Sequence, residues 1–139
     1  MTEIRETGWA QDQRALAAIR RAVFIEEQGV PEALEWDEAD ALSAHFLACC
    51  DGVPVGCARL LPDGHLGRMA VLPAFRGRGV GRALLAAALA SARRRGFAEV
   101  VLSAQTHAAG FYARAGFVTE GAAYEEAGIP HVAMTLALG

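Results

Sequence analysis

The sequence predicts an α/β protein in which helices flank a mixed, mostly antiparallel central sheet. The first observation is an apolar segment, 66–72, that leads through a glycine-rich turn, 76–82, into an alanine- and leucine-rich segment, 83–92. This order is typical of a strand, a tight turn and a helix. The second observation is that short apolar runs bounded by glycine and proline lie on both sides of this centre. Together these patterns predict the order β-α-β-β-β-α-β-α-β-β.

The first half of the sequence is predicted to contain one helix and four strands. Asp12 is placed to cap a helix over 13–27, and Gly29-Val30-Pro31 ends it. The acidic stretch that continues to Ser43 is expected to be a loop with a short helical turn. Asp51-Gly52-Val53-Pro54 is typical of a hairpin turn. The strands of this half are predicted at 3–8, 45–50, 55–61 and 65–72.

The second half is predicted to alternate between helices and strands. Apolar residues recur along one face of a helix over 80–95, which ends in three arginines and is followed by Gly96. Cations in the last turn favour the helix dipole. A shorter helix over 107–114 is closed by Gly116. The strands of this half are predicted at 99–104, 117–122 and 131–138.

Composition excludes several classes of protein. At 139 residues the chain is expected to form one domain, 1–139, with a core of its own. Its net charge of −3 argues against a nucleic-acid partner. No apolar run approaches the ~20 residues of a membrane span, and the amino terminus does not resemble a signal peptide. The three cysteines have neither zinc nor disulfide spacing. We therefore expect a cytoplasmic protein with free thiols, no metal and no membrane partner.

Charge is unevenly distributed along the chain. Residues 68–95 contain seven arginines and no acid, whereas residues 26–40 contain seven acids and no base. The basic segment suits a polyanionic cofactor. The acidic segment is consistent either with attraction of a cationic amine or with a solvated acidic loop, and the sequence leaves both interpretations open.

The glycine-rich turn 76–82 is a candidate anion site. Glycine permits close approach of a ligand, and the first turn of a helix presents unpaired N–H groups and a positive dipole end. A Walker loop is excluded because the chain has no lysine, and a Rossmann loop requires a different glycine spacing. Arg76, Gly79 and Gly81 match the pattern Gln/Arg-x-x-Gly-x-Gly/Ala. This pattern resembles the acetyl-CoA pyrophosphate loop of the GNAT acetyltransferase superfamily; the alternative is a tight turn with solvated arginines.

A second motif strengthens the resemblance. Phe111-Tyr112-x-x-x-Gly116-Phe117 is similar to another GNAT signature, whose tyrosine commonly lies near the acetyl-CoA sulfur. The segment from Tyr124 to His131, with Gly128-Ile129-Pro130 before the histidine, resembles the small bacterial ElaA-like and YjcF-like branch. The predicted order of elements is also that of the GNAT fold. The resemblance extends over nearly the whole chain.

The resemblance implies a set of cofactor-binding residues around the loop and the second motif. Gln105 stands where many members have asparagine near the cofactor. The residues expected at acetyl-CoA are Met69, Ala70, Val71, Arg76, Gly77, Arg78, Gly79, Val80, Gly81, Arg82, Gln105, Phe111 and Tyr112.

The implied reaction is attack of a neutral amine on the acetyl-CoA thioester, through a tetrahedral oxyanion. A backbone N–H near Met69 to Val71 is expected to stabilise the oxyanion. Tyr112 is the expected proton donor to the leaving thiolate, although it could also be a core aromatic residue with a solvated hydroxyl. His107 and His131 are candidate bases, and either could instead have a structural role.

The resemblance also implies an acceptor site between the first helix and the last hairpin, which flank that pocket in the family. The residues assigned to it are Phe24, Glu27, Gln28, Tyr124 and Glu125. Three glutamates could also act as bases through water: Glu26, Glu27 and Glu125. His45 and His65 are interpreted as structural.

The expected function is thus an acetyl-CoA-dependent N-acetyltransferase that acts on a primary amine of a small acceptor. The alternative is a GNAT-fold module that binds CoA or another nucleotide without turnover. The acceptor remains open among a small amine, an amino sugar, an amino acid and a protein N-terminus. Dimers are common in the family, so a homodimer is also an open expectation.

Overall fold

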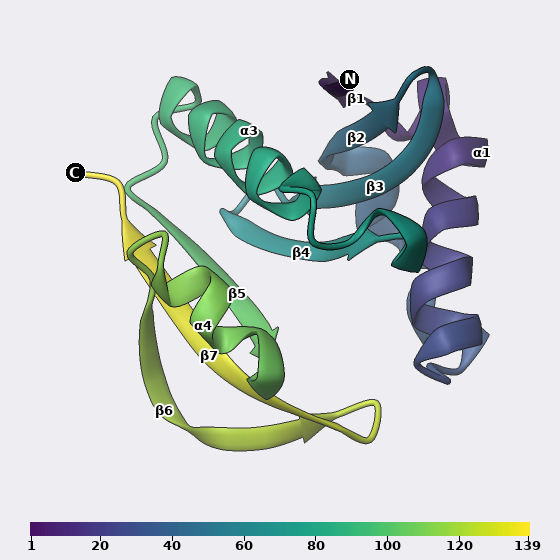
Figure 1. The fold of residues 1–139 in the computed structure, drawn as a ribbon. Coiled ribbons are helices and arrows are strands. Elements are labelled where there is room, and N and C mark those ends of the chain that lie inside the picture. Colours follow the sequence, from purple (N-terminus) through teal and green to yellow (C-terminus); the bar gives the residue numbers. More distant parts are fainter.

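The computed structural model describes residues 1–139 and contains one sheet of seven strands (Figure 1). The strands are β1 (Thr2–Thr7), β2 (Ala44–Cys50), β3 (Val53–Leu60), β4 (His65–Val71), β5 (Glu99–Gln105), β6 (Val118–Glu126) and β7 (Ile129–Ala137). The α-helices are α1 (Trp9–Arg20), α2 (Glu32–Glu35), α3 (Val80–Arg94) and α4 (Ala109–Ala113). A π-helical segment, η1 (Arg21–Glu27), continues α1, and three short 3₁₀ segments complete the set: η2 (Glu38–Leu42), η3 (Pro73–Phe75) and η4 (Thr106–Ala108). The predicted order of strands and helices is confirmed.

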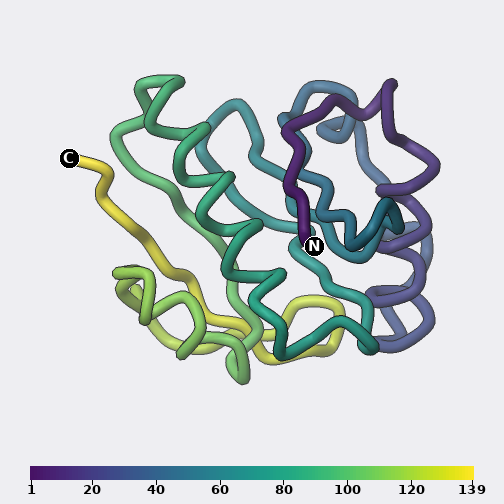
Figure 2. The backbone as a smooth tube through the Cα atoms, turned by 45° about the horizontal axis from the view of Figure 1, so that its top comes forward, coloured from purple at the N-terminus to yellow at the C-terminus, as the bar shows by residue number.

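The strand order in the sheet is β1-β2-β3-β4-β5-β7-β6, and every neighbouring pair is antiparallel except β4–β5. The parallel pair is in register at His65–Val101 and Leu66–Leu102 alone. Beyond Leu66 and Leu102 the two strands diverge, as Figure 1 shows. We call this divergence the splay. It divides the sheet into an amino-terminal half (β1–β4) and a carboxy-terminal half (β5–β7), which lie on opposite sides of Figure 2.

The helices cover both faces of the sheet because the strands alternate apolar side chains between the faces. In β2, Phe46 packs into the larger core cluster with Leu84 and Leu85 of α3. The next residue, Leu47, packs into a smaller cluster with Leu16 and Ile19 of α1. α3 and α1 therefore lie on opposite faces of the amino-terminal half. None of the helices is long and apolar enough to cross a membrane.

The boundaries of two elements differ from the prediction by more than two residues. The first helix begins at Trp9, and Asp12 does not cap it: Asp12 has a non-helical φ of −126° within the helix, and its carboxylate accepts hydrogen bonds from Thr7 and Arg5. The penultimate strand continues past the predicted end at residue 122, because the register shift between Glu120 and Tyr124 absorbs the irregular residues and pairing with β7 then resumes.

Within the acidic stretch 26–40, two of the seven acids are buried and paired with arginines, whereas the other five are exposed. Glu35 and Asp40 are buried, at 3% and 2% exposure, and they bind the buried Arg20 at 2.8 and 2.7 Å. Arg59 also binds Asp40, at 3.0 Å. These residues, together with Arg68 and Asp37, form a network of three arginines and three carboxylates that we call the buried ion network. Distant arginines thus neutralise these acids, a pairing that the local charge pattern cannot reveal.

Arg20 is the centre of this network. Its guanidinium lies over the rings of Trp9 and Trp36, at 5.3 and 5.1 Å from their centroids. Burial alone would raise the pKa of Asp40, but hydrogen bonds and charges from Arg20 and Arg59 outweigh burial and hold that pKa below its usual value. The network fixes the segment between α1 and β2 against the sheet.

We predict that Arg20→Met lowers the free energy of unfolding by about 3–5 kcal/mol, since removal of one member leaves buried carboxylates short of a partner. Urea denaturation measures this change. The matched control is Arg21→Met: the neighbouring arginine has an exposed ion pair with Glu32, whose loss is expected to have no measurable effect. Equal changes in the free energy of unfolding for the two substitutions would show that the buried ion network stabilises the protein no more than the exposed ion pair does.

Candidate functional site

The glycine-rich turn lies at the amino terminus of α3. Gly77 and Gly79 have φ values of +76° and +82°, in the left-handed region that glycine adopts without strain. Gly79 is the N-cap residue of α3, and no side chain caps the helix. The first N–H groups of a helix of 15 residues are therefore free to bind an anion. Arg78 lies over the Phe75 ring, with its guanidinium 5.3 Å from the centroid.

A hollow of about 230 Å³ lies beside this turn, between α3 and α4. Leu85, Phe111 and Ala115 supply apolar surface, and Arg82 and Arg114 add two cations. Such a combination suits a flat ring that carries a phosphate.

Arg76 and Glu27 pair with each other in this structure, although the sequence assigns one to the cofactor and the other to the acceptor. The guanidinium binds both carboxylate oxygens of Glu27, at 2.6 and 2.8 Å, and its Nε donates to the carbonyl of Val71 at 2.9 Å. The hydrogen bond from Arg76 lowers the pKa of Glu27. Glu27 is thus a stabilised carboxylate and a weak base, and Arg76 ties the turn to η1. Phe24, also in η1, is partly buried against the smaller core cluster.

Two further residues of the expected cofactor site can contribute only backbone groups. The Val80 side chain is buried in the larger core cluster, and the Ala70 side chain is buried against α1. At Gly81 a Cβ would lie 3.5 Å from the Phe111 ring, which is an ordinary van der Waals contact, so packing alone does not require glycine there.

The end of β4 borders the splay. Arg68 has a positive φ of 47°, and the register between β3 and β4 shifts near it. After Leu66, β4 has no strand partner on its β5 side, which leaves backbone groups of residues 67–71 without sheet pairing there. This unpaired edge includes the segment from Met69 to Val71 that the sequence assigns to the oxyanion.

Tyr112 meets this edge from α4. Its hydroxyl donates to the Met69 sulfur at 3.7 Å, and its ring makes edge-to-face contacts with Phe111 and Phe117. Burial raises the pKa of Tyr112 to about 12, so the phenol stays protonated at neutral pH. The tyrosine is both a packed aromatic residue and a proton donor that points to the splay.

The carboxy-terminal half brings together several other predicted residues on its face opposite α4. His131 is buried, is the register partner of Gln105 and Tyr124, and stacks with the Tyr124 ring. The Tyr124 hydroxyl forms a hydrogen bond with Ser103. Gln105 pairs with Gln28, which comes from the end of η1. We call these five residues (Gln28, Ser103, Gln105, Tyr124 and His131) the acceptor wall.

The tautomer of His131 follows from the hydrogen bond between its ring and the backbone. Nδ1 lies 2.7 Å from the carbonyl oxygen of Ile129, which can only accept a hydrogen bond. Neutral His131 therefore carries its proton on Nδ1 and keeps a lone pair on Nε2. Nε2 lies 3.7 Å from the Glu126 carboxylate.

The remaining candidate bases have different surroundings. His107 and Glu26 are exposed, and neither forms a hydrogen bond or ion pair through its side chain. Glu125 alternates to the face of β6 opposite Tyr124, away from the acceptor wall. The two histidines interpreted as structural have local partners: His45 is buried and bonds to the Asp40 carbonyl, and His65 pairs with Asp63.

Sequence reasoning missed Ser103 and Glu126. Glu126 could not be found from the predicted strand, which ended at residue 122; the longer β6 places it two residues after Tyr124 on the same face. Ser103 is two residues before Gln105 on β5 and could have been found from the alternation of faces along a strand. No group of three or more histidine, cysteine or acidic side chains is arranged to hold a metal ion.

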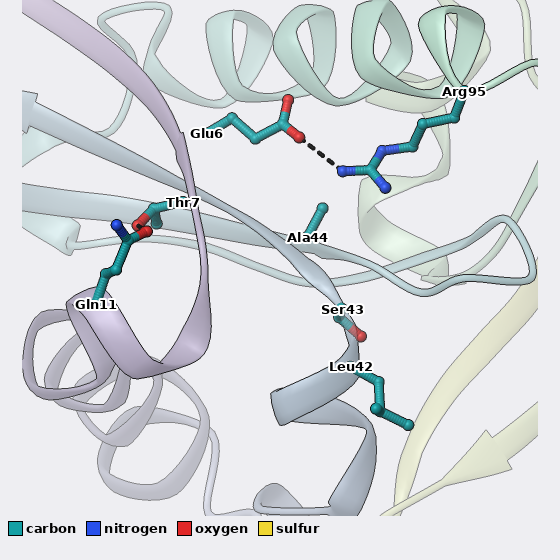
Figure 3. A pocket seen from close by; sticks show the side chains of 7 residues that line it. All are labelled: Glu6, Thr7, Gln11, Leu42, Ser43, Ala44 and Arg95. Atoms are coloured by element: carbon teal, nitrogen blue, oxygen red, sulfur yellow. Dashed lines mark hydrogen bonds and ion pairs between the residues drawn. The ribbon is translucent and has the colours of Figure 1, made fainter.

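A separate hollow of about 370 Å³ lies near the carboxyl end of α3 (Figure 3). Glu6 and Arg95 form an ion pair across it at 2.8 Å, and Thr7, Gln11 and Ser43 are among its other lining residues. The length of α3 separates this hollow from the glycine-rich turn, so it is not part of the acceptor wall or the splay.

Comparison with known proteins gives a consistent result. The family model described as "Acetyltransferase (GNAT) domain" matches residues 8–138. The chain is 37% identical over 120 residues to the N-acetyltransferase YjcF of Bacillus subtilis, which is described as uncharacterized, with 84% of this chain and 86% of YjcF covered.

Two crystal structures are similar over almost their whole length. An acyl-CoA N-acyltransferase from Pseudomonas aeruginosa has a TM-score of 0.88 and 33% identity, with 99% of this chain and 100% of that chain covered. Escherichia coli ElaA has a TM-score of 0.87 and 31% identity, with coverages of 97% and 99%.

We predict that Glu27→Gln leaves the pH dependence of turnover unchanged, because the carboxylate of Glu27 is occupied by Arg76 and is not the base. The measurement is the rate of acyl transfer against pH for the variant and the unchanged protein. Loss of the limb on which the rate rises with pH would instead assign the base to Glu27.

Proposed function

The chain belongs to the GNAT acetyltransferase family and is an acyl-CoA-dependent transferase, and from this premise we propose that it transfers the acetyl group of acetyl-CoA to a primary amine. The observation that carries the proposal is the position of the uncapped α3 amino terminus and its glycine-rich turn beside the splay, where Tyr112 contacts Met69. An anion site and a proton donor thus border the same unpaired strand edge.

The donor is proposed to bind along this edge. Its pyrophosphate accepts hydrogen bonds from the turn and the first N–H groups of α3. The hollow lined by Arg82 and Arg114 supports binding of the nucleotide end, with its additional phosphate. The thioester then extends along β4 toward Met69 and the Tyr112 hydroxyl.

The proposed mechanism is direct attack. The amine adds to the thioester carbonyl, and the tetrahedral oxyanion is stabilised by a backbone N–H of the unpaired segment from Met69 to Val71. When the carbon–sulfur bond breaks, Tyr112 donates its proton to the leaving thiolate. A phenol whose pKa is about 12 is fully protonated before this step.

His131 is the base that the geometry supports best. The nitrogen of the neutral amine becomes positively charged as its bond to the carbonyl carbon forms, and the Nε2 lone pair of His131 is available to accept the proton that this nitrogen then loses, directly or through water. His107 is exposed and no neighbouring group orients its ring, so it is the weaker candidate. The proposal assigns no step to a metal ion.

The function is tested by calorimetric titration with acetyl-CoA, followed by measurement of free thiol released in the presence of a panel of amines. Binding with thiol release for at least one amine is the expected result. Binding without release for every amine would favour a module that holds CoA without turnover, and absence of binding would contradict the donor site.

We predict that Gly79→Glu abolishes acetyl-CoA binding, since the side chain adds a negative charge and bulk at the pyrophosphate position. Calorimetry measures the affinity. Gly52→Glu is the matched control: Gly52 has a φ of +83° and, like Gly79, no atom within 4 Å of the point where a Cβ would lie, but it belongs to the β2–β3 turn. The affinity of the Gly52→Glu variant for acetyl-CoA is expected to be unchanged. Equal affinities for both variants would contradict the assignment of the turn.

We predict that Tyr112→Phe lowers turnover by about 10²-fold or more while acetyl-CoA affinity stays nearly constant, because the ring still packs but the proton donor is lost. Steady-state kinetics and calorimetry separate the two effects. Unchanged turnover would show that Tyr112 has a packing role alone.

A further inference from the structure

Two side-chain amides, one after η1 and one at the end of β5, form hydrogen bonds with each other across the splay. Gln105 Nε2 donates to Gln28 Oε1 at 2.8 Å, and Gln28 Nε2 donates to Gln105 Oε1 at 3.4 Å. Gln28 follows η1, Gln105 ends β5, and 77 positions separate them in the sequence. Both side chains are half-buried. The pair therefore bridges elements on opposite sides of the splay.

The π-helical winding of η1 determines where Gln28 lies. Its backbone N–H donates to the carbonyl of Val23, five residues earlier, at 3.1 Å. In an α-helix the partner would be four residues earlier, so the wider turn changes the direction in which the Gln28 side chain leaves the helix. Such segments are rare and often occur at functional sites. The winding thus supports a functional role for Gln28.

The other groups of the acceptor wall are uncharged hydrogen-bonding groups beside aromatic rings. Gln105 is the register partner of His131, and Tyr124 stacks on His131 while its hydroxyl bonds to Ser103. Amides, a phenol, a serine hydroxyl and a neutral imidazole can each donate and accept hydrogen bonds.

Some fixed charges on this side of the splay are paired, whereas Glu26 of η1 is exposed and has no ion pair. Glu27 binds Arg76, and Arg68 binds two carboxylates of the buried ion network. Glu126, at the rim, has a side chain that is 58% exposed. The five residues of the wall themselves include no fixed cation for the carboxylate of an amino acid and no carboxylate for a polyamine.

We propose that Gln28 and Gln105 are specificity-determining residues and that the acceptor is a small primary amine bearing hydroxyl groups, such as an amino sugar or an amino alcohol. The proposal rests on the proposed function and names the substrate class of that site. An amide presents a carbonyl and an NH₂ group side by side, which suits a hydroxyl that both donates and accepts. Because the second bond of the pair is long, Gln105 Oε1 retains capacity for a further donor from the acceptor.

The experiment compares kcat/KM for three groups of amines: amino sugars and amino alcohols, polyamines, and amino acids. The hydroxylated amines are expected to be the best substrates of the unchanged protein. Gln28→Leu and Gln105→Leu are each expected to lower kcat/KM for these substrates roughly tenfold or more, mainly through the acceptor KM, and Gln28→Leu is expected to leave the acetyl-CoA affinity unchanged. In the same variants, kcat/KM for an apolar amine of similar size is expected to fall much less.

Two further variants make the test specific. Gln13→Leu is the matched control, because Gln13 is exposed on α1 and forms no hydrogen bond through its side chain, and its kinetics are expected to be unchanged. Gln28→Glu adds a carboxylate to the wall and is expected to raise the rate with polyamines relative to hydroxylated amines.

Three results would overturn the inference. The unchanged protein could prefer polyamines or amino acids, or the leucine variants could lower kcat/KM equally for every acceptor. The third result is no turnover of any hydroxylated amine while acetyl-CoA still binds. Failure to bind acetyl-CoA would instead overturn the proposed function, so the two failures are distinguishable.

Discussion

The whole arrangement depends on the limited pairing of the two parallel strands. β4 and β5 are in register at two residue pairs and then separate, which leaves one edge of β4 without a strand partner. The left-handed backbone at Arg68 and the register shift with β3 accompany this separation. Unpaired backbone groups in the middle of a sheet need partners. A ligand that extends along β4 can supply them, which is the physical basis for a thioester site at the splay.

The buried ion network holds the segment between α1 and β2 against the sheet. A short helical segment such as α2 is not stable by itself, so it requires tertiary contacts. Arg20 and Arg59 supply these by binding Glu35 and Asp40 in the interior. The bidentate pair between Arg76 and Glu27 adds a second connection, from the glycine-rich turn to η1. Arginine suits both places because its planar group forms several hydrogen bonds of fixed geometry.

The proposed mechanism divides the chemistry between the two faces of the carboxy-terminal half. Tyr112 approaches from α4 and contacts Met69, next to the anion site of α3. His131 and Gln105 lie on the opposite face, with Gln28. A donor and an acceptor bound on these two sides would meet at the splay, and the proton donor and the base would be separated.

The sequence by itself determined the strands of the sheet, the main helices that flank it, the glycine-rich turn and the tyrosine of α4. These depend on local properties: apolar periodicity, glycine at positive φ and the spacing within short motifs. Tertiary structure alone decided which charges neutralise each other and which polar side chains share a face. Arg76 and Glu27 are 49 positions apart, and Gln28 and Gln105 are 77 apart, so no local pattern reports their contact. Strand register brings such residues together, because each one-residue step along a strand reverses the face on which a side chain lies.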